Sequence, residues 1–264
     1  MSWKNNRYVV IPSYKRHDMI IKKTMGLCNK FNIPSSNIYL FIVDDIDEIN
    51  NYSKLKETFN NINIIKGPLG LTNMRNFITL FFPENTELIH MDDDIDEIYE
   101  YDEEIQKLLP YTSEKFINFI NSAFDLCYKN NACLFGIYPV KNPFFMKDLP
   151  IITYDLRFCV GAFWGCINKH NIILKLTEKE DFERTLLFYI NHGNNIIRFN
   201  RITIKTNYYK NKGGMQANNI DRYELSKESC LYLKNVYPNY IKTILIKKNG
   251  MTEIRLRTGC TNNI

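Results

Sequence analysis

The sequence lacks the apolar segments that mark membrane and secreted proteins. Nowhere in its 264 residues is there an apolar run of roughly eighteen residues, the least that a helix needs to cross a bilayer. Residues 1–7 are polar and basic, whereas a secretory signal would carry an apolar segment. We therefore expect a protein of the cytoplasm or nucleus that is neither secreted nor held in a membrane.

Paired cysteines are also lacking. The seven cysteines are odd in number, form no Cys-x-x-Cys pair and mostly have apolar neighbours. Such cysteines are typical of buried, reduced thiols in a reducing compartment. A disulfide framework and a zinc site are therefore not expected.

Negative charge is scarce in the last quarter of the chain. Residues 198–264 contain thirteen Lys or Arg and four Asp or Glu, although the whole chain has a net charge of only +5. A basic segment of this kind can attract a polyanion such as DNA. It can equally be an ordinary solvated surface, and composition leaves both interpretations open.

What the sequence does contain is an alternation of short apolar runs and amphipathic segments. The apolar runs predict strands at 7–11, 38–43 and 62–65 and another from residue 87, and helical spacing predicts helices at 18–31, 46–59 and 72–81. Pro12 should end the first strand, because proline has no ladder N–H, and Thr72 should cap the third helix. This order indicates a parallel sheet with helices on both faces.

The remainder of the chain continues the pattern less regularly. We expect helices at 113–130, 178–191 and 222–236, strands at 133–138, 154–168 and 196–206, a flap-like loop at 139–150 and a hairpin at 241–256. The prediction is a single α/β domain of 1–264, with a mixed, mostly parallel central sheet.

Three consecutive aspartates, Asp92, Asp93 and Asp94, follow the apolar run that starts at Glu87. Residues two apart point the same way in an extended chain, so Asp92 and Asp94 could hold one Mg²⁺ or Mn²⁺ through oxygen ligands. The alternative is a solvated acidic turn, and the acidic residues that continue over 96–104 favour it.

Four polar segments follow the four predicted strands. They are 12–16, Asp44-Asp45, 67–76 and 92–94. In parallel sheets ligands bind beyond the carboxyl ends of the strands, so these segments should meet at one edge. Their convergence favours a site for a metal ion and a diphosphate over a solvated turn.

These motifs resemble those of the GT-A glycosyltransferases, which bind nucleotide sugars. The resemblance rests on Pro-Ser-Tyr-Lys-Arg at 12–16, the two Asp-Asp segments and Gly-Leu-Thr-Asn-Met-Arg-Asn at 70–76. More narrowly, 70–76, 179–184 and 208–214 are similar to the TET/JBP-associated glycosyltransferases, a group with kinetoplastid, viral and phage members. The match covers most of 7–216. It implies a nucleotide-sugar-binding half at 7–96, an acceptor half at 97–216 and a basic addition at 217–264.

The resemblance also implies a reaction. It is the metal-dependent, inverting transfer of a sugar from a UDP-sugar, best UDP-glucose, to 5-hydroxymethyluracil in DNA. Asp94, with Asp92, would hold Mn²⁺ or Mg²⁺, Asp181 would be the base that accepts the proton, and Glu180 would be its neighbour or a sugar contact. Helix-dipole stabilisation is the competing explanation for two acids at that helix start.

Further residues are expected at the donor by the same resemblance. Those with expected contacts to the base, the ribose or the diphosphate are Pro12, Ser13, Tyr14, Arg16, Asp44, Asp45, Gly70, Asn73, Arg75, Asp93, Lys212, Gly213 and Gly214. Arg75 could instead be a surface arginine, and Trp164 could either stack on a ligand or pack in the core. Glu183 should be exposed and paired with Arg184 or Lys179.

Two departures and three alternatives remain. Many GT-A enzymes have a histidine near 208–216 as a third metal ligand, and none of the four histidines falls there. The acceptor could instead be a glycan or protein, or the chain could be a non-catalytic DNA-binding module on a degenerate GT-A fold. A nucleotidyltransferase would have a glycine-rich loop after the first strand, which residues 12–16 are not. No obligate protein partner is evident, and a viral origin would fit the narrower group.

Overall fold

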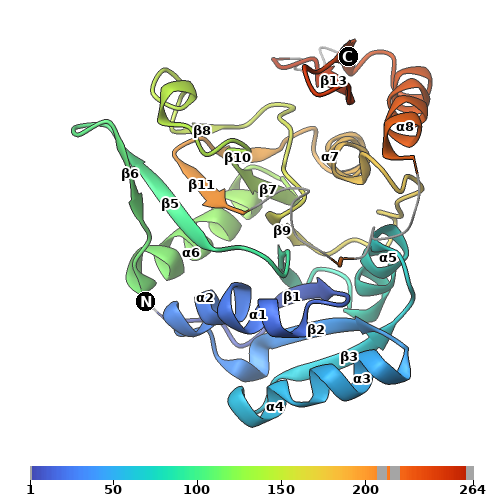
Figure 1. The fold of residues 1–264 in the computed structure, drawn as a ribbon. Helices are drawn as coiled ribbons and strands as arrows, with labels where there is room; N and C mark the ends of the chain where they lie inside the picture. The colour runs from blue at the N-terminus through green and yellow to red at the C-terminus, as the bar shows by residue number, and fades with distance from the viewer. Residues whose placement is uncertain (1, 207–212, 215–220, 260–264) are drawn as a thin grey trace.

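The computed structural model describes residues 2–206, 213–214 and 221–259. Its centre is an eight-stranded sheet in the order β3-β2-β1-β4-β9-β7-β10-β8 (Figure 1). The strands are β1 (Arg7–Ser13), β2 (Ile38–Val43), β3 (Asn63–Gly67), β4 (Glu87–Met91), β7 (Leu134–Ile137), β8 (Ile152–Thr153), β9 (Phe163–Ile167) and β10 (Ile197–Phe199). β1 pairs in parallel with β2 and β4, and β2 with β3, which confirms the parallel half that the alternation predicts.

Helices cover both faces of this sheet. They are α1 (His17–Lys22), α2 (Thr24–Lys30), α3 (Ile46–Ser53), α4 (Leu55–Thr58), α5 (Leu71–Phe81), α6 (Ser113–Lys129), α7 (Glu180–Asn191) and α8 (Arg222–Val236). Side chains alternate across a strand, so Val9 and Ile11 of β1 enter one core and Val10 enters the other. The first core contains residues of α1 to α4 and α6, and the second contains residues of α5, α7 and α8.

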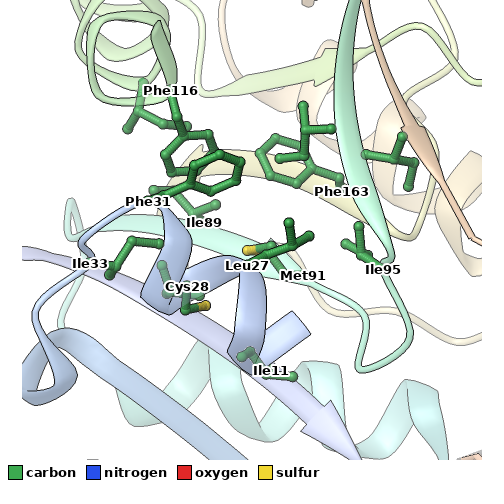
Figure 2. Packing of buried hydrophobic residues seen from close by; sticks show 14 of the residues in the cluster. Ile11, Leu27, Cys28, Phe31, Ile33, Ile89, Met91, Ile95, Phe116 and Phe163 are labelled. Atoms are coloured by element: carbon green, nitrogen blue, oxygen red, sulfur yellow. The ribbon is translucent and has the colours of Figure 1, made fainter. Parts of the chain in front are cut away.

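The first core is dominated by aromatic and branched side chains. Phe31 of α2 stacks on Phe116 of α6 with ring centroids 4.2 Å apart, over Ile89 and Met91 of β4 (Figure 2). This packing fixes α2 and α6 against the end of β4. The aspartates that follow β4 are thereby positioned by a rigid, buried strand.

Several predicted boundaries are wrong. Pro12 does not end β1 but pairs with Phe41 inside it, and the helix expected at 18–31 breaks at Lys23, where φ is −107° and ψ is −103°. Thr72 does not cap α5, since its hydroxyl donates to the Leu176 carbonyl at 2.6 Å. The helix expected at 46–59 is divided into α3 and α4.

The middle of the chain differs more. Only β9 forms within the strand expected at 154–168, and the strand expected at 196–206 is β10 and β11 (Ile202–Lys205), which belong to different sheets. β11 pairs with β5 (Glu97–Asp102), and β5 with β6 (Lys107–Pro110). The acidic run after the aspartates is therefore largely a strand hairpin, in which Ile98 and Tyr101 turn inward.

The C-terminal elements confirm their prediction. α8 spans the expected residues, and β12 (Ile241–Ile246) pairs antiparallel with β13 (Thr252–Leu256) around Gly250, whose φ is +83°. The six described cysteines are free thiols. Within the described residues, none of the helices has the length and apolar character needed to cross a membrane.

Candidate active site

A cleft of about 1230 Å³ opens at the carboxyl edge of the parallel strands. Its walls come from the ends of β1 and β4, the starts of α5 and α7, the loop before β9 and the β12–β13 hairpin. Asp92, Asp93 and Asp94 lie on one side of it, and Glu180 and Asp181 come from the start of α7. Two acidic segments almost ninety residues apart in the sequence thus share one cleft.

The turn after β4 is held by backbone contacts. The Asp92 N–H donates to the Ala162 carbonyl at 2.9 Å, which continues the pairing with β9. Thr24 donates to the Asp92 carbonyl at 2.6 Å and accepts the Ile95 N–H at 3.0 Å. These bonds fix the backbone on both sides of the aspartates, so the three side chains have set directions.

The three carboxylates have different partners. Asp93 is buried and accepts bonds from Ser13 at 2.6 Å and from the Arg16 guanidinium at 2.7 Å. Asp94 accepts from the Thr206 hydroxyl at 2.7 Å and lies 3.4 Å from Arg16. The side chain of Asp92 is 33% exposed, which leaves it the most accessible of the three.

Negative charge accumulates at this end of the cleft. Burial raises the pKa of Asp92 to about 7, with further contributions from the Asp94, Asp93 and Glu180 carboxylates, while Arg75 opposes the shift. Burial also raises the pKa of Asp93, against the effect of Arg16. A cation near Asp92 would relieve this repulsion.

A divalent ion fits the donor chemistry of the site. Mg²⁺ and Mn²⁺ take oxygen ligands, and Mg²⁺ is commonly held by one or two carboxylates together with substrate phosphates and water. Asp92 and Asp94 would supply the two carboxylates. The described part of the chain contains no group of three Asp, Glu, His or Cys arranged as a metal site, so phosphate and water oxygens would complete the shell.

The loop after β1 adjoins these aspartates. Pro12 and Arg16 line the cleft, whereas Ser13 is fully buried and its hydroxyl is shared between Asp93 and Tyr52. The Tyr14 carbonyl accepts the Gly214 N–H at 2.9 Å. Ser13 and Tyr14 therefore shape the loop through internal bonds.

Two expected loop glycines approach this segment closely. Arg16 donates to the Gly213 carbonyl at 3.2 Å. Gly213 and Gly214 have φ of +76° and +98°, and a Cβ there would lie 2.7 Å from the Lys15 carbonyl oxygen and 2.8 Å from the Arg16 guanidinium, respectively. Only glycine fits this approach without displacement. Lys212 lies outside the described residues.

Four expected donor residues lie away from the cleft lining. Asp45 caps α3 by accepting the Asp47 and Glu48 N–H groups, and Asp44 is exposed with its carboxylate 3.8 Å from Lys66. Gly70 occupies the N-cap of α5 at φ +96°, and Asn73 donates to the Leu69 carbonyl at 3.0 Å. Their geometry gives each a local structural role.

Arg75 joins the two acidic segments. It is 2% exposed, so the surface-arginine alternative is wrong. Its guanidinium lies 3.3 Å from Asp92 and 3.7 Å from Glu180, and it donates to the Gly161 carbonyl at 3.0 Å. Arg75 thus spans from the end of β4 to the start of α7.

Asp181 faces the cleft from the first turn of α7. Lys179 precedes the helix in the left-handed conformation, at φ +63°, and no side chain caps it. Burial and the Glu180 carboxylate raise the pKa of Asp181 to about 7, against the effect of Arg184. A carboxylate with a pKa near neutrality is suited to accept a proton.

Gly161 provides room beside this carboxylate. A Cβ at Gly161 would lie 3.3 Å from the Glu180 carboxylate and 3.6 Å from the Asp181 Cβ. Because the next residue, Ala162, accepts the Asp92 N–H, the same short segment contacts both acidic groups.

Three side chains differ from or refine the expectations. Glu183 is buried and accepts the Lys175 and Leu176 N–H groups at 2.8 and 2.9 Å, so the exposed ion pair expected for it is wrong. Trp164 is buried in the core, stacked on His90 at 3.6 Å with the Arg184 guanidinium 4.0 Å from its ring.

Sequence reasoning missed Arg184 and much of the cleft wall. The missed basic residues of the wall are Arg157, Arg198, Arg222, Lys242, Lys247 and Arg255. Their signal in the sequence is only the basic composition after residue 197. It gives no indication that the hairpin closes the cleft.

Comparisons with known proteins agree with the fold. No family model and no curated protein matches the chain. Among solved structures, S. aureus TarS matches with a TM-score of 0.50 at 14% identity, over 87% of this chain and 40% of that one.

Two ligand complexes are also similar. TarS 1-349 in complex with UDP has a TM-score of 0.48 at 14% identity, over 75% of this chain and 59% of that one. The mannosyltransferase PcManGT from Pyrobaculum calidifontis, in complex with GDP-Man and Mn²⁺, has a TM-score of 0.49 at 8% identity, over 75% and 57%. This chain therefore spans little more than half the length of those chains.

The chain has the α/β fold of the GT-A glycosyltransferases, with a mixed, mostly parallel central sheet. At these identities the likeness concerns the fold alone. The comparisons give no support to the narrower resemblance to the TET/JBP-associated group.

Proposed function

We propose that this protein is a metal-dependent glycosyltransferase that uses a nucleoside diphosphate sugar. The observation that carries the proposal is the shared cleft, which has Asp92 and Asp94 at the end of β4 and Asp181 at the start of α7. A transferase needs a cation at the leaving diphosphate and a base at the attacking hydroxyl. The two acidic segments supply one group for each task.

Asp92 and Asp94 would hold Mn²⁺ or Mg²⁺, and that ion would neutralise charge on the leaving diphosphate. In the transfer step the acceptor oxygen bonds to the anomeric carbon as the bond from that carbon to the diphosphate oxygen breaks. The Asp181 carboxylate accepts the hydroxyl proton, and the nucleoside diphosphate departs. We propose inversion at the anomeric carbon, because a single displacement from the opposite face needs only this one base.

Arg75 and Glu180 assist without entering the bond changes. Arg75 holds Asp92 toward the cleft through its 3.3 Å contact and carries positive charge close to Glu180. Glu180 raises the pKa of Asp181, which keeps Asp181 basic enough to accept a proton near neutral pH.

For the substrates, we propose UDP-glucose as donor and 5-hydroxymethyluracil in DNA as acceptor. The motif resemblance suggests both, and the basic residues that line the cleft support a polyanionic acceptor. A base in a duplex presents its 5-substituent in the major groove.

Mass spectrometry tests the proposal. Duplex DNA with hydroxymethyluracil is incubated with the protein, UDP-glucose and Mn²⁺, beside unmodified DNA and an Asp181→Ala protein. Gain of one hexose on the modified strand only, lost in the variant, supports the donor, the acceptor and the base. Slow hydrolysis of UDP-glucose without DNA modification would instead indicate a glycan or protein acceptor. If the protein binds DNA without turnover of any sugar nucleotide, it is a binding module and the proposal fails.

A further inference from the structure

The β12–β13 hairpin forms a fixed wall of the cleft. Ile241, Ile254 and Leu256 are buried in the second core, and Ser226 of α8 donates to the Thr252 carbonyl at 2.8 Å. Lys234, also on α8, donates to the Ile241 carbonyl at 2.7 Å. Helix and hairpin therefore form one packed unit, which lies next to α7 in Figure 1.

This wall stands on the side of the proposed base. Lys179, just before α7, lies 3.3 Å from Glu253 of β13, and Arg222 of α8 lies 2.6 Å from Glu178. Glu253 also contributes to the raised pKa of Asp181, so its charge acts at the base. The hairpin thus borders the acceptor side of the cleft rather than the aspartates after β4.

The basic residues on the wall divide into two groups. Lys247 pairs with Glu253 and Arg222 with Glu178, so their charges are compensated internally. Lys242 and Arg255 also line the cleft and are exposed, yet neither forms an ion pair within the described residues. Strand alternation turns Arg255 outward between the buried Ile254 and Leu256.

Uncompensated cations beside a reaction cleft attract phosphate groups, and a chain of phosphodiesters releases counterions when it binds them. We infer that the β12–β13 hairpin holds the phosphodiester backbone of the acceptor on the base side of the cleft, through Lys242 and Arg255. The inference rests on the proposed function for the identity of the acceptor, a nucleic acid. It assigns to the hairpin a task separate from donor binding.

The test measures binding without a donor. Affinity of the full chain for a fluorescent DNA duplex is followed by anisotropy at several salt concentrations, for the wild type and for a Lys242→Gln/Arg255→Gln protein. The matched control is Lys248→Gln/Arg257→Gln, which removes the same charge from exposed residues of the hairpin region that do not line the cleft. Thermal unfolding checks that both variants remain folded.

The cleft-facing variant should bind more weakly, and the slope of log affinity against log salt should fall by about 2, about 1 for each phosphate contact. The control variant should keep the wild-type slope. Affinity for UDP, measured by calorimetry, should be equal in all three proteins.

Other results overturn the inference. Equal slopes for the two variants would mean that the hairpin acts only through total charge, and weaker UDP binding would place these cations at the donor diphosphate. A wild type that binds no DNA or RNA but glycosylates a neutral acceptor would refute both this inference and the DNA acceptor. If the duplex binds as predicted and no sugar is transferred, the proposed function fails while the binding surface stands.

Discussion

The two acidic segments of the cleft are alike in sequence but divide their carboxylates between two tasks. After β4, Asp93 is buried against Ser13 and Arg16, while Asp92 faces the cleft. At the start of α7, Glu183 is buried against backbone N–H groups, while Asp181 faces the cleft. Asp92 and Asp181 both have a pKa raised to about 7. The comparison teaches that each segment contains a structural carboxylate and a carboxylate available for chemistry.

The largest expected effect is on the metal side. Asp94→Asn should abolish turnover while the protein stays folded, because the amide removes a charged ligand of the proposed ion. Turnover and Mn²⁺ binding, by calorimetry, are both measured. Asp96→Asn is the control, since Asp96 pairs with Lys23 and Lys205. An active Asp94→Asn protein with unchanged Mn²⁺ dependence would remove the metal assignment.

Asp181→Asn should lower kcat by about 10²- to 10⁴-fold, because a positioned base contributes about this much. Donor KM should change little, since Asp181 belongs to the acceptor side of the comparison. Steady-state kinetics with UDP-glucose measure both constants. Glu224→Gln, in the first turn of α8, is the matched control. Equal kcat in wild type and variant would leave Asp181 a helix-dipole residue.

The raised pKa values predict opposite pH trends for activity and stability. Asp181 must be ionised to accept a proton, so kcat should fall as the pH drops through about 7. The folded state binds the Asp92 and Asp181 protons more tightly than the unfolded chain, so their contribution to stability declines as pH rises from about 4 to about 7. Denaturant unfolding of the metal-free protein gives the second trend, and Asp181→Asn should weaken it. A variant profile identical to the wild type would contradict the assignment.

Glu183→Gln should reduce the free energy of unfolding by about 1–3 kcal/mol, because one of two buried N–H groups risks losing its acceptor. Chemical denaturation measures the change. In the protein that remains folded, kcat should change far less than in Asp181→Asn. A hundredfold fall in kcat without loss of stability would instead place Glu183 in the chemistry.

The smallest effects should come from the pair after β2. Asp45→Ala removes the cap of α3 and should cost about 0.5–2 kcal/mol of stability, whereas Asp44→Asn should change it by less than about 0.5 kcal/mol. Neither should alter donor KM, measured by initial rates. A clear rise in KM for Asp44→Asn would show that it contacts the donor, as the motif resemblance implies.

The parallel half of the fold was predictable from sequence because its signals are local. An apolar run such as 38–43 reads as a buried strand, and the observed β2 has those bounds. The strand expected at 196–206 fails for a non-local reason. Its apolar residues are buried throughout, but the chain turns at Asn200 and Arg201 and passes from one sheet to another.

The sequence by itself determined which residue types gather at the sheet edge. Strand periodicity and the positions of Asp92, Asp94 and Asp181 were sufficient for that. Only the tertiary structure decided which carboxylates are internally bonded, that Arg75 joins the two acidic segments, and that the C-terminal hairpin lines the cleft. The reason is physical: partners, burial and pKa depend on contacts between residues far apart in the chain, and periodicity describes only neighbours.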